Sequence, residues 1–496
     1  MYTGITADKD IKNTPLDQYL QIPVFNESFI NIANLLFNSW ISKEKFLNNL
    51  IIREPMNVAV LGSGISGLGI AYRLAKNGVK VTLIEKSNEL GGLASSFKIN
   101  GYSIEKFYHV IQQKDKIFLN LLKELGLDDK IIWREISTGF YFKNKIYKLN
   151  TPIDLLFFKP LPFFERIKFG YKILQVSNIR DWKSLDKVNA KDWLIREWGK
   201  GIYKNLFEPL LKTKFGVSID NASAAFVFGR VRAASVSKSK KVGKEKYAYI
   251  SGGYQQFIDK FEESIKNLEC NVMKNTKVLG LYKNGKNYKI SVKKEGRVEF
   301  LNFDLVVNTL PLNLFPKILQ EFPNQIYNQT SRIKYQGVIC LLLGLRKKLC
   351  DCWWVNILDE NLPFGVVVEH TNLGGCNQCT EHIIYLAKYL PPTDDIFNKT
   401  DEEIETLYTK KLNEIFPNFH PEDIAWWKLS RSKVATPLFD VNFFERMPSD
   451  KLLDGLYTAG SYKVYPDSRN LNEILKHSFD LSERIMDDIN IQRKVF

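Results

Sequence analysis

The stretch VAVLGSGISGLGIAYRLAKNGVKVTLIEKSNELGGLASSF, residues 58–97, decides the fold of this chain. Its first apolar run ends at Gly62 and leads into G-S-G-I-S-G, after which apolar residues recur at helical spacing. A second apolar run ends at Glu85, and the glycine pair Gly91 and Gly92 follows. Strand, glycine turn, helix and strand in this order predict a βαβ unit of a doubly wound α/β domain.

The three glycines of the turn have separate roles in such a unit. Gly62 allows the tight turn, Gly64 lets backbone approach a pyrophosphate, and Gly67 lets the helix pack closely on the strand. The helix N-terminus offers free N–H groups and partial positive charge to the phosphates. Glu85 lies at the right distance to bind a ribose hydroxyl pair. A glycine-rich turn without a ligand is the alternative, but the complete unit favours a dinucleotide site.

The continuation after Glu85 separates flavin from nicotinamide. EKSNELGGLASSF resembles the extended fingerprint of FAD-dependent enzymes of the amine oxidase, phytoene desaturase and protoporphyrinogen oxidase-like superfamily, in which a second glycine pair approaches the flavin side. That family usually has Arg after the pair, where this chain has Leu93. The resemblance implies FAD as cofactor, bound within this stretch by Gly62, Ser63, Gly64, Ile65, Ser66, Gly67, Glu85, Lys86, Gly91, Gly92, Leu93 and Ala94.

Two later segments resemble the same family. ISGGYQQFIDKF is similar to its glycine-pair entry to a helix, and the strand after that helix contains Val278, whose backbone would meet the adenine. DGLYTAGSYKVYPDSRNLNEILKHS is similar to its C-terminal flavin segment, with a strand that ends at Gly460 and a helix N-terminus directed at the cofactor. The resemblance implies that Gly460, Ser461 and Tyr465 contact the cofactor. Bacterial protoporphyrinogen oxidase-like oxidoreductases are the most similar subgroup.

Candidate catalytic residues lie in two places. GYSIEKFYHV follows the fingerprint, and by the resemblance Glu105, Tyr108 and His109 face the flavin ring. His109 would donate a proton or a hydrogen bond there, and a packed histidine satisfied by backbone is the alternative. Arg469 has a fork of donors that suits the flavin or a substrate phosphate, and a surface arginine is its alternative.

The net charge of +15 favours anionic partners, either phosphorylated ligands or an anionic membrane surface. No nucleic-acid motif occurs, so nucleic acid is not predicted. Residues 154–172, DLLFFKPLPFFERIKFGYK, combine apolar and basic side chains with few acids, as peripheral membrane segments do. A core-facing helix pair in the substrate domain is the favoured interpretation of this segment. The small substrate is predicted to be apolar or phosphorylated, and the oligomeric state is not predicted.

The start MYTGITADKD is not a signal peptide, and no apolar run is long enough to span a bilayer. We therefore expect a cytoplasmic protein, with peripheral membrane contact as an option.

Overall the class is α/β, or α+β for the whole chain, with a split Rossmann-type FAD-binding domain and a mixed sheet-and-helix substrate domain. The basic run 231–247 is interpreted as a loop. The predicted organisation is an N-terminal, partly helical extension, 1–55; an FAD-binding domain, 56–115, 245–320 and 450–496; and a substrate domain with a helical insert, 116–244 and 321–449.

Six cysteines are scattered through the chain, and C-x-C and C-x-x-C pairs occur among them. No histidine pair lies in register with them, so reduced thiols are favoured over a zinc site and no metal is predicted.

The function expected from the resemblance is FAD-dependent oxidation, dehydrogenation or desaturation by hydride transfer between substrate and flavin. The apolar insert favours an isoprenoid- or lipid-linked substrate. Two alternatives stay open: a redox-neutral sugar-nucleotide isomerase resembling UDP-galactopyranose mutase, and a non-catalytic flavin-binding protein.

Overall fold

The computed structural model describes residues 56–176, 179, 181–239, 246–374, 379–467 and 469–495. The predicted extension 1–55 lies outside these residues.

The first sheet has six strands in the order β10-β2-β1-β14-β22-β21. The strands are β1 (Asn57–Leu61), β2 (Lys80–Ile84), β10 (Asn271–Met273), β14 (Leu305–Asn308), β21 (Lys451–Leu453) and β22 (Leu456–Thr458). All pairings are parallel except that of β21 with β22 at one edge. Three chain segments far apart in sequence thus build one parallel sheet, which confirms the predicted Rossmann-type α/β class.

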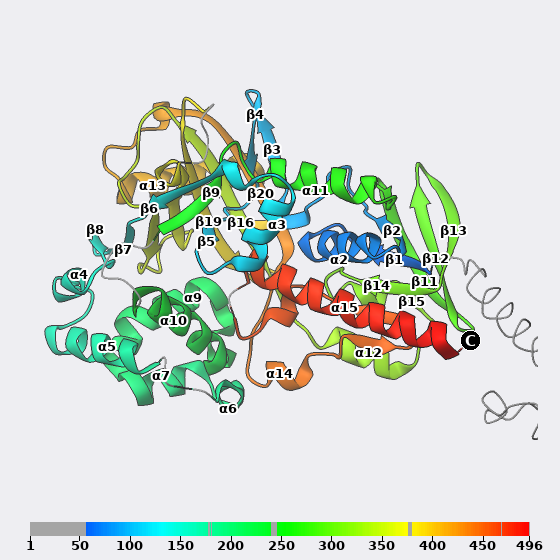
Figure 1. The fold of residues 1–496 in the computed structure, drawn as a ribbon. Helices are drawn as coiled ribbons and strands as arrows, with labels where there is room; N and C mark the ends of the chain where they lie inside the picture. Colours follow the sequence, from blue (N-terminus) through cyan, green and yellow to red (C-terminus); the bar gives the residue numbers. More distant parts are fainter. Residues whose placement is uncertain are drawn as a thin grey trace, which may run out of the picture. The chain divides into compact units, whose positions relative to one another are not determined.

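Helix α2 (Ile65–Lys76) follows β1 and lies between α11 (Gln255–Asn267) and α15 (Leu471–Val495), as Figure 1 shows. The rings of Tyr72 on α2 and Phe261 on α11 meet edge to face, with centroids 5.4 Å apart. On the other side Gly69 allows a close approach, because a Cβ there would lie 3.2 Å from the Leu475 Cδ2 atom of α15. The C-terminal helix is therefore packed directly on the fingerprint helix.

A second sheet, in the order β13-β12-β11-β15, adjoins the end of β2. Its strands are β11 (Thr276–Asn284), β12 (Asn287–Lys294), β13 (Arg297–Phe303) and β15 (Leu319–Gln320). The Thr276 amide donates to the Glu85 carbonyl at 2.8 Å, and this bond joins the two sheets. Two small sheets complete this part of the molecule: β3 (Ser96–Ile99) with β4 (Tyr102–Glu105), and β5 (Ile111–Gln112) and β6 (Ile131–Glu135) on either side of β9 (Lys246–Ile250).

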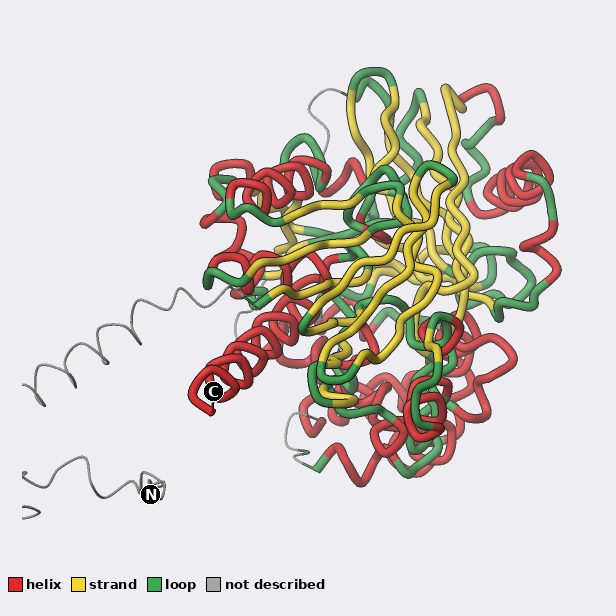
Figure 2. The backbone as a smooth tube through the Cα atoms, turned by 90° about the vertical axis from the view of Figure 1, so that its right-hand side faces the viewer, coloured by secondary structure: helices red, strands yellow, loops and turns green. Residues whose placement is uncertain are grey.

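The largest sheet has seven strands in the order β20-β16-β19-β18-β17-β7-β8, and its long strands are prominent in Figure 2. The strands are β7 (Thr138–Phe142), β8 (Lys145–Lys148), β16 (Tyr335–Leu345), β17 (Trp354–Ile357), β18 (Val366–Glu369), β19 (His382–Leu390) and β20 (Ile424–Pro437). Every residue of β16 is buried, and α13 (Asp401–Ile415) packs against it. Strands β7 and β8 pair antiparallel as a hairpin.

Helices form a separate layer at the lower left of Figure 1. They are α4 (Pro152–Leu156), α5 (Phe163–Val176), α6 (Trp182–Asp186), α7 (Ala190–Trp198), α8 (Lys200–Ile202), α9 (Glu208–Phe215) and α10 (Ala224–Ser239). Their inward side chains make an aromatic core that includes the fully buried Trp193 and Trp198. The loop predicted for 231–247 was wrong in its first part, because α10 continues to Ser239. The alanine in this small-residue run favours a helix once its N-terminal half packs in the core. The other helices are α3 (Lys116–Glu124), α12 (Asn324–Ser331) and α14 (Phe443–Arg446).

In the described part of the chain, no helix has the length and apolarity required to cross a membrane. Nor do three or more His, Cys, Asp or Glu side chains come together there as a metal site would need. Cys270, Cys340, Cys350 and Cys352 are free thiols, whereas Cys379 is disulfide-bonded. The prediction of reduced thiols was therefore wrong for Cys379, since pairing depends on how closely two sulfurs approach in space.

Candidate functional site

The turn between β1 and α2 has the geometry that its glycines predict. Gly62 has a φ of 93°, and its amide donates to the Ile84 carbonyl at the end of β2 at 2.9 Å. A Cβ on Gly67 would lie 1.9 Å from the Gly62 carbonyl oxygen, so only glycine fits there. Gly64 caps α2 without a side-chain acceptor, and the first turn, which holds Ile65 and Ser66, has no acid. Its N–H groups are therefore available to an anion.

The second glycine pair lies directly beside this turn. Gly91 pairs with Gly64 in an isolated β-bridge, and a Cβ on Gly92 would lie 3.3 Å from the Gly64 Cα. A Cβ on Gly64 itself would meet no atom within 4 Å, so its backbone borders open space. Bare backbone, free N–H groups and open space together fit the pyrophosphate of a dinucleotide. Leu93 and Ala94 continue from this pair in a short helical turn, η3 (Gly92–Ala94).

Glu85 is held rigidly at the end of β2. Its Oε2 atom accepts from the Ser63 amide at 2.8 Å and from the Ser63 hydroxyl at 2.7 Å, while Oε1 accepts from the Ser87 amide at 2.9 Å. Val278 lies two residues beyond the bond that joins β11 to Glu85. The neighbouring Lys86 is exposed. The carboxylate is therefore preorganised next to the turn, where a ribose hydroxyl pair could exchange for the serine donors.

His109 lies next to the second glycine pair. Its Nε2 atom is 3.3 Å from the Leu93 carbonyl oxygen. Since a carbonyl only accepts, Nε2 carries the proton and Nδ1 is left as an acceptor. Burial lowers the pKa of His109 to about 4, with a smaller contribution from the positive charge of Arg469 and partial opposition from the hydrogen bond to Leu93. The imidazole is therefore neutral near pH 7, suited to hydrogen bonding and not to donating a proton from an imidazolium.

Glu105 and Tyr108 lie in an aromatic region behind His109. The Glu105 carboxylate is fully buried and accepts from the Tyr249 hydroxyl at 2.5 Å and the Tyr254 amide at 2.5 Å, while burial raises its pKa. This carboxylate is thus committed to the core. Tyr108 has its ring centroid 5.0 Å from that of Trp354 in an edge-to-face contact. Burial raises the pKa of Tyr108 well above its ordinary value, so its hydroxyl stays protonated.

Arg469 is held between the seven-stranded sheet and the loop before α15. Its Nη1 atom donates to the Ala435 carbonyl of β20, and its Nη2 atom donates to the Tyr389 hydroxyl of β19 at 3.3 Å. The Lys214 ammonium of α9 lies 3.7 Å from the centroid of the same Tyr389 ring. The sequence did not single out Lys214 or Tyr389, although PLLKTKFG, one of the segments that carries the resemblance, contains Lys214.

The C-terminal segment differs in part from its expected geometry. Gly460 follows β22 with a φ of 150°, and Ser461 begins the short turn η11 (Ser461–Val464). The Tyr465 hydroxyl is 2.5 Å from Asp186 Oδ1 and 2.6 Å from the Ser223 hydroxyl, so it is directed into the helical layer.

The helix end after this segment is already capped. Asn470 Oδ1 accepts from the Glu473 amide at 2.9 Å, and the carboxylate of Glu473 lies in the first turn of α15. Asn472 Oδ1 in turn accepts from the amides of Ile117 and Phe118 at the start of α3. The first turn of α15 therefore already has hydrogen-bond partners within the protein, whereas the first turn of α2 has no side-chain cap.

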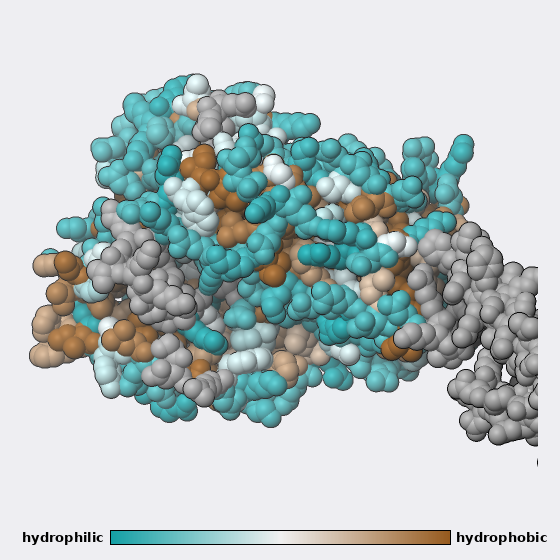
Figure 3. All heavy atoms as spheres, in the orientation of Figure 1, coloured by the Kyte–Doolittle hydropathy of each residue, from teal (hydrophilic) through white to brown (hydrophobic). Residues whose placement is uncertain are grey.

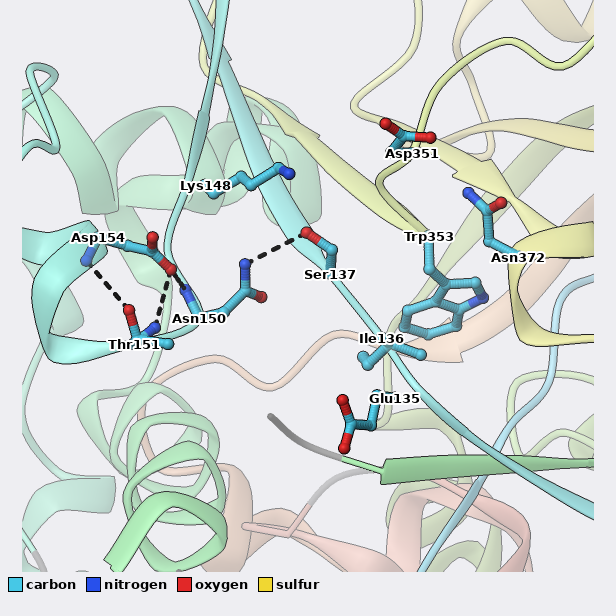
Figure 4. A pocket seen from close by; sticks show the side chains of 10 residues that line it. All are labelled: Glu135, Ile136, Ser137, Lys148, Asn150, Thr151, Asp154, Asp351, Trp353 and Asn372. Carbon is cyan, nitrogen blue, oxygen red and sulfur yellow. Dashed lines mark hydrogen bonds between the residues drawn. The ribbon is translucent and has the colours of Figure 1, made fainter. Parts of the chain in front are cut away.

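A pocket of about 360 Å³ lies elsewhere, beside β7 and β8, and Figure 4 shows the side chains around it. Asp154 there accepts from the amides of Asn150 and Thr151 at 2.8 and 2.9 Å, which caps α4. None of the predicted site residues lines this pocket, so we assign it no part in the chemistry.

Comparison with known proteins identifies the family. The model of the flavin-containing amine oxidoreductase family matches residues 65–468. The chain belongs to this family. It is an enzyme, an FAD-dependent oxidoreductase, and the alternative of a non-catalytic flavin-binding protein is not supported.

Two curated relatives show what the chain is similar to. The 15-cis-phytoene desaturase of an Oncidium hybrid cultivar is 23% identical over 450 residues, which cover 84% of this chain and 75% of the relative. The coproporphyrinogen III oxidase of Staphylococcus aureus is 26% identical over 267 residues, which cover 47% of this chain and 56% of that protein. The chain thus matches little more than half the length of the oxidase.

Solved structures show the same fold at low identity. Wild-type putrescine oxidase bound to putrescine has a TM-score of 0.68 at 17% identity, with 87% of this chain and 99% of that one covered. Reduced UDP-galactopyranose mutase has a TM-score of 0.67 at 14% identity, with 88% and 94% covered. At these identities the likeness establishes the fold alone.

Proposed function

We propose that this oxidoreductase takes a hydride from a C–H bond of an apolar isoprenoid- or lipid-linked substrate that it collects at an anionic membrane surface. FAD, when bound, supplies the redox chemistry by accepting the hydride. The substrate loses a proton as well, so a new double bond forms. An external acceptor, such as oxygen, a quinone or another protein, then takes the electrons. The observation that carries the proposal is an exposed apolar surface on α4 and α5.

That surface gathers most of the large apolar side chains that the described residues expose. Phe157 is 72% exposed and Phe164 is 83% exposed. The sequence favoured a core-facing helix pair, and this was wrong for one side of the pair. Phe158 and Leu161, between the two helices, do enter the core, but large apolar side chains of α4 and α5 face outward, in the brown area at the left of Figure 3. The docking surface consists of Ile153, Leu156, Phe157, Phe163, Phe164, Ile167, Tyr171 and Leu174.

The charges around this docking surface favour an anionic partner. Lys159 and Lys168 are exposed beside the apolar side chains. The two acids of the stretch are turned away, because Asp154 caps α4 and Glu165 packs against Gly201 of α8. Exposed aromatic and aliphatic side chains with basic neighbours are typical of helices that lie in a lipid interface.

The residues near the expected flavin side would shape the reaction by position. Neutral His109 would keep one hydrogen bond fixed on the Leu93 carbonyl and present Nδ1 as an acceptor. Tyr108 and Trp354 would form an apolar wall that excludes water from the reacting carbon. Such a wall suits a hydrocarbon substrate better than a polar one.

Anaerobic absorption spectra of the purified protein test this function. We expect a yellow protein that stays yellow with NADH or NADPH and loses its colour when 15-cis-phytoene, the isoprenoid named in one relative, is added in anionic vesicles. Loss of colour with coproporphyrinogen III, a tetracarboxylate named in the other relative, and not with phytoene would contradict an apolar substrate. A colourless protein that takes up no FAD would contradict the function as a whole.

A redox-neutral isomerase resembling UDP-galactopyranose mutase is the second candidate. The observation in its favour is the placement of the cations Arg230 and Arg469 near one another, where a nucleotide diphosphate would need positive charge. Bleaching by NADH or NADPH, followed by isomerisation of a sugar nucleotide without net oxidation, would support it over the oxidative function.

A further inference from the structure

Three basic side chains converge on Tyr389 from separate elements. Lys214 of α9 lies over its ring at 3.7 Å, and Arg469 donates to its hydroxyl at 3.3 Å. Arg230 of α10 lies near Tyr389 and Arg469, because the backbone of α10 closely approaches the loop before α15. A Cβ on Gly229 would lie 2.3 Å from the Pro466 carbonyl oxygen, so α10 touches the loop that carries Arg469.

No carboxylate of the described residues neutralises these three cations. Among the described residues, none of the three forms an ion pair with Asp or Glu, although other lysines and arginines do so throughout the surface. Arg469 has a carbonyl and a phenol as partners, and Lys214 has an aromatic face. Like charges held together without a counter-ion oppose folding unless a bound anion offsets their repulsion.

Lys214 and Arg469 are half-buried, and Arg230 beside them is exposed, so a ligand from solvent can reach the cations. Burial lowers the pKa of Lys214 well below its ordinary value, and the charges of Arg230 and Arg469 lower it further. Burial also lowers the pKa of Arg230, although its side chain keeps solvent access.

The pyrophosphate of the cofactor has its own place, at the free N–H groups of Gly64 and the first turn of α2. The cations come instead from the helical layer and from the loop against β19 and β20. His109 lies between the two regions, because it bonds to Leu93 beside the glycine pair and also feels the charge of Arg469. A second anion, separate from the cofactor, therefore fits these cations.

We propose that Lys214, Arg230 and Arg469 bind an anionic head group of the substrate, a carboxylate or a phosphate, and so hold its apolar body against Tyr108 and Trp354. The proposal rests on the proposed function and adds to it that the substrate is amphiphilic. The two arginines suit bidentate contact with either group, and Lys214 adds a point charge.

Calorimetric titration of the FAD-loaded protein with octyl phosphate, octanoate and octanol tests the proposal. The three probes share one chain and differ in the head group, so their affinities isolate its charge. We expect the anions to bind at least about tenfold more tightly than octanol, because charge-assisted hydrogen bonds exceed neutral ones by this much. The tighter of the two anions identifies the head group as phosphate or carboxylate.

Arg230→Gln and Arg469→Gln should each weaken anion binding by about ten- to a hundredfold and leave octanol binding unchanged. Lys212→Gln is the matched control, because Lys212 lies two residues before Lys214 but pairs with Glu360 on the surface at 2.7 Å. Lys214→Met should raise the Tm of the ligand-free protein, since it removes an amine whose charged form is disfavoured by burial and by Arg230 and Arg469. FAD content and Tm report whether each variant is folded.

Two results would overturn the inference. One is no difference between the anions and octanol, including the case in which no probe binds. The other is a loss of FAD from Arg230→Gln or Arg469→Gln with unchanged affinity for the anions, which would assign the cations to the cofactor. Failure of the proposed function would show differently, as a flavin that no apolar substrate reduces while octanoate or octyl phosphate still binds.

Discussion

Gly64 and Gly67 are three residues apart in one turn, yet the space around them differs completely. A Cβ on Gly64 meets no atom within 4 Å, whereas a Cβ on Gly67 would lie 1.9 Å from backbone. Gly64 also has a φ of −62°, which alanine adopts without strain. Gly64 is thus required only by a ligand that binds next to it, whereas Gly67 is required by the fold.

We therefore predict opposite outcomes for alanine at these two positions. Gly64→Ala should leave the Tm of the FAD-free protein unchanged and weaken FAD binding by about five- to a hundredfold, as overpacking of a contact costs about 1–3 kcal/mol. Gly67→Ala should lower the Tm itself. Thermal melts and flavin titration of both variants measure this. Unchanged FAD affinity in Gly64→Ala would remove the pyrophosphate from this turn.

His370 is a buried histidine that is 1% exposed, and neither of its nitrogens has a hydrogen-bond partner within the described part of the chain. Burial lowers its pKa from 6.5 to about 3. Between these values the unfolded chain binds a proton that the folded protein excludes. The contribution of His370 to the free energy of unfolding is therefore fully present above pH 6.5 and falls as the pH decreases toward 3.

The variant His370→Phe should lose this pH dependence. Relative to the parent protein, its free energy of unfolding should rise by about 2–3 kcal/mol between about pH 7.5 and about pH 4.5, since one pKa unit corresponds to about 1.4 kcal/mol. Urea melts at both pH values give the comparison. His420→Gln, at an exposed histidine, is the control. If the difference in free energy of unfolding between the parent and His370→Phe does not change with pH, the lowered pKa of His370 is contradicted.

Among the elements, α4 and α5 are held on the helical layer by the segment that joins them. This segment packs Phe158 and Leu161 into the aromatic core, while the two helices expose the docking surface. Arg166 of α5 fastens the pair, since its Nε atom donates to the Leu161 carbonyl at 2.7 Å. This bond helps to fix the position of the docking surface, for which we propose contact with an anionic membrane.

The double variant Phe157→Ser/Phe164→Ser should lose at least about tenfold in binding to phosphatidylglycerol vesicles at low salt, because each phenylalanine contributes up to about 1.5–3 kcal/mol on burial. Val298→Ser/Phe300→Ser, on β13, removes two other exposed apolar side chains and serves as the control. Co-sedimentation measures both. If the parent protein fails to sediment with anionic vesicles, the membrane proposal is wrong.

At the scale of the whole molecule, Tyr465 connects the segment after β22 of the six-stranded sheet to the helical layer. Its hydroxyl contacts Asp186 of α6 at 2.5 Å and Ser223 before α10 at 2.6 Å. Asp186 is 2% exposed, and burial raises its pKa. A buried carboxyl that loses such a donor is costly to leave unpaired.

We expect Tyr465→Phe to lower the free energy of unfolding by about 1.5–3 kcal/mol, the range for hydrogen bonds to charged groups, while FAD content stays the same. Urea melts and the flavin absorbance of the purified protein measure the two quantities. Tyr171→Phe, at an exposed tyrosine, should change stability by less than about 0.5 kcal/mol. Lost FAD at unchanged stability would instead support the cofactor contact that the sequence resemblance implied for Tyr465.

The sequence by itself determined the βαβ unit around Gly62, Gly64, Gly67 and Glu85, the α/β class and the FAD-dependent family. These features are local, because the turn, the helix after it and the acid at the end of the next strand all lie in residues 58–97. The buried parallel strands there appear in the sequence as continuous apolar runs. The helical insert of the substrate domain could be predicted for the same reason.

Only the tertiary structure decided which way side chains face and which distant residues meet. Periodicity marks α4 and α5 as helices with apolar residues on more than one side, but packing alone decides which side stays exposed. Lys214, Arg230, Tyr389 and Arg469 come from four elements spread over more than 250 residues, and no spacing in the chain relates them. Their convergence follows from sheet pairing and helix packing, which depend on the whole core at once.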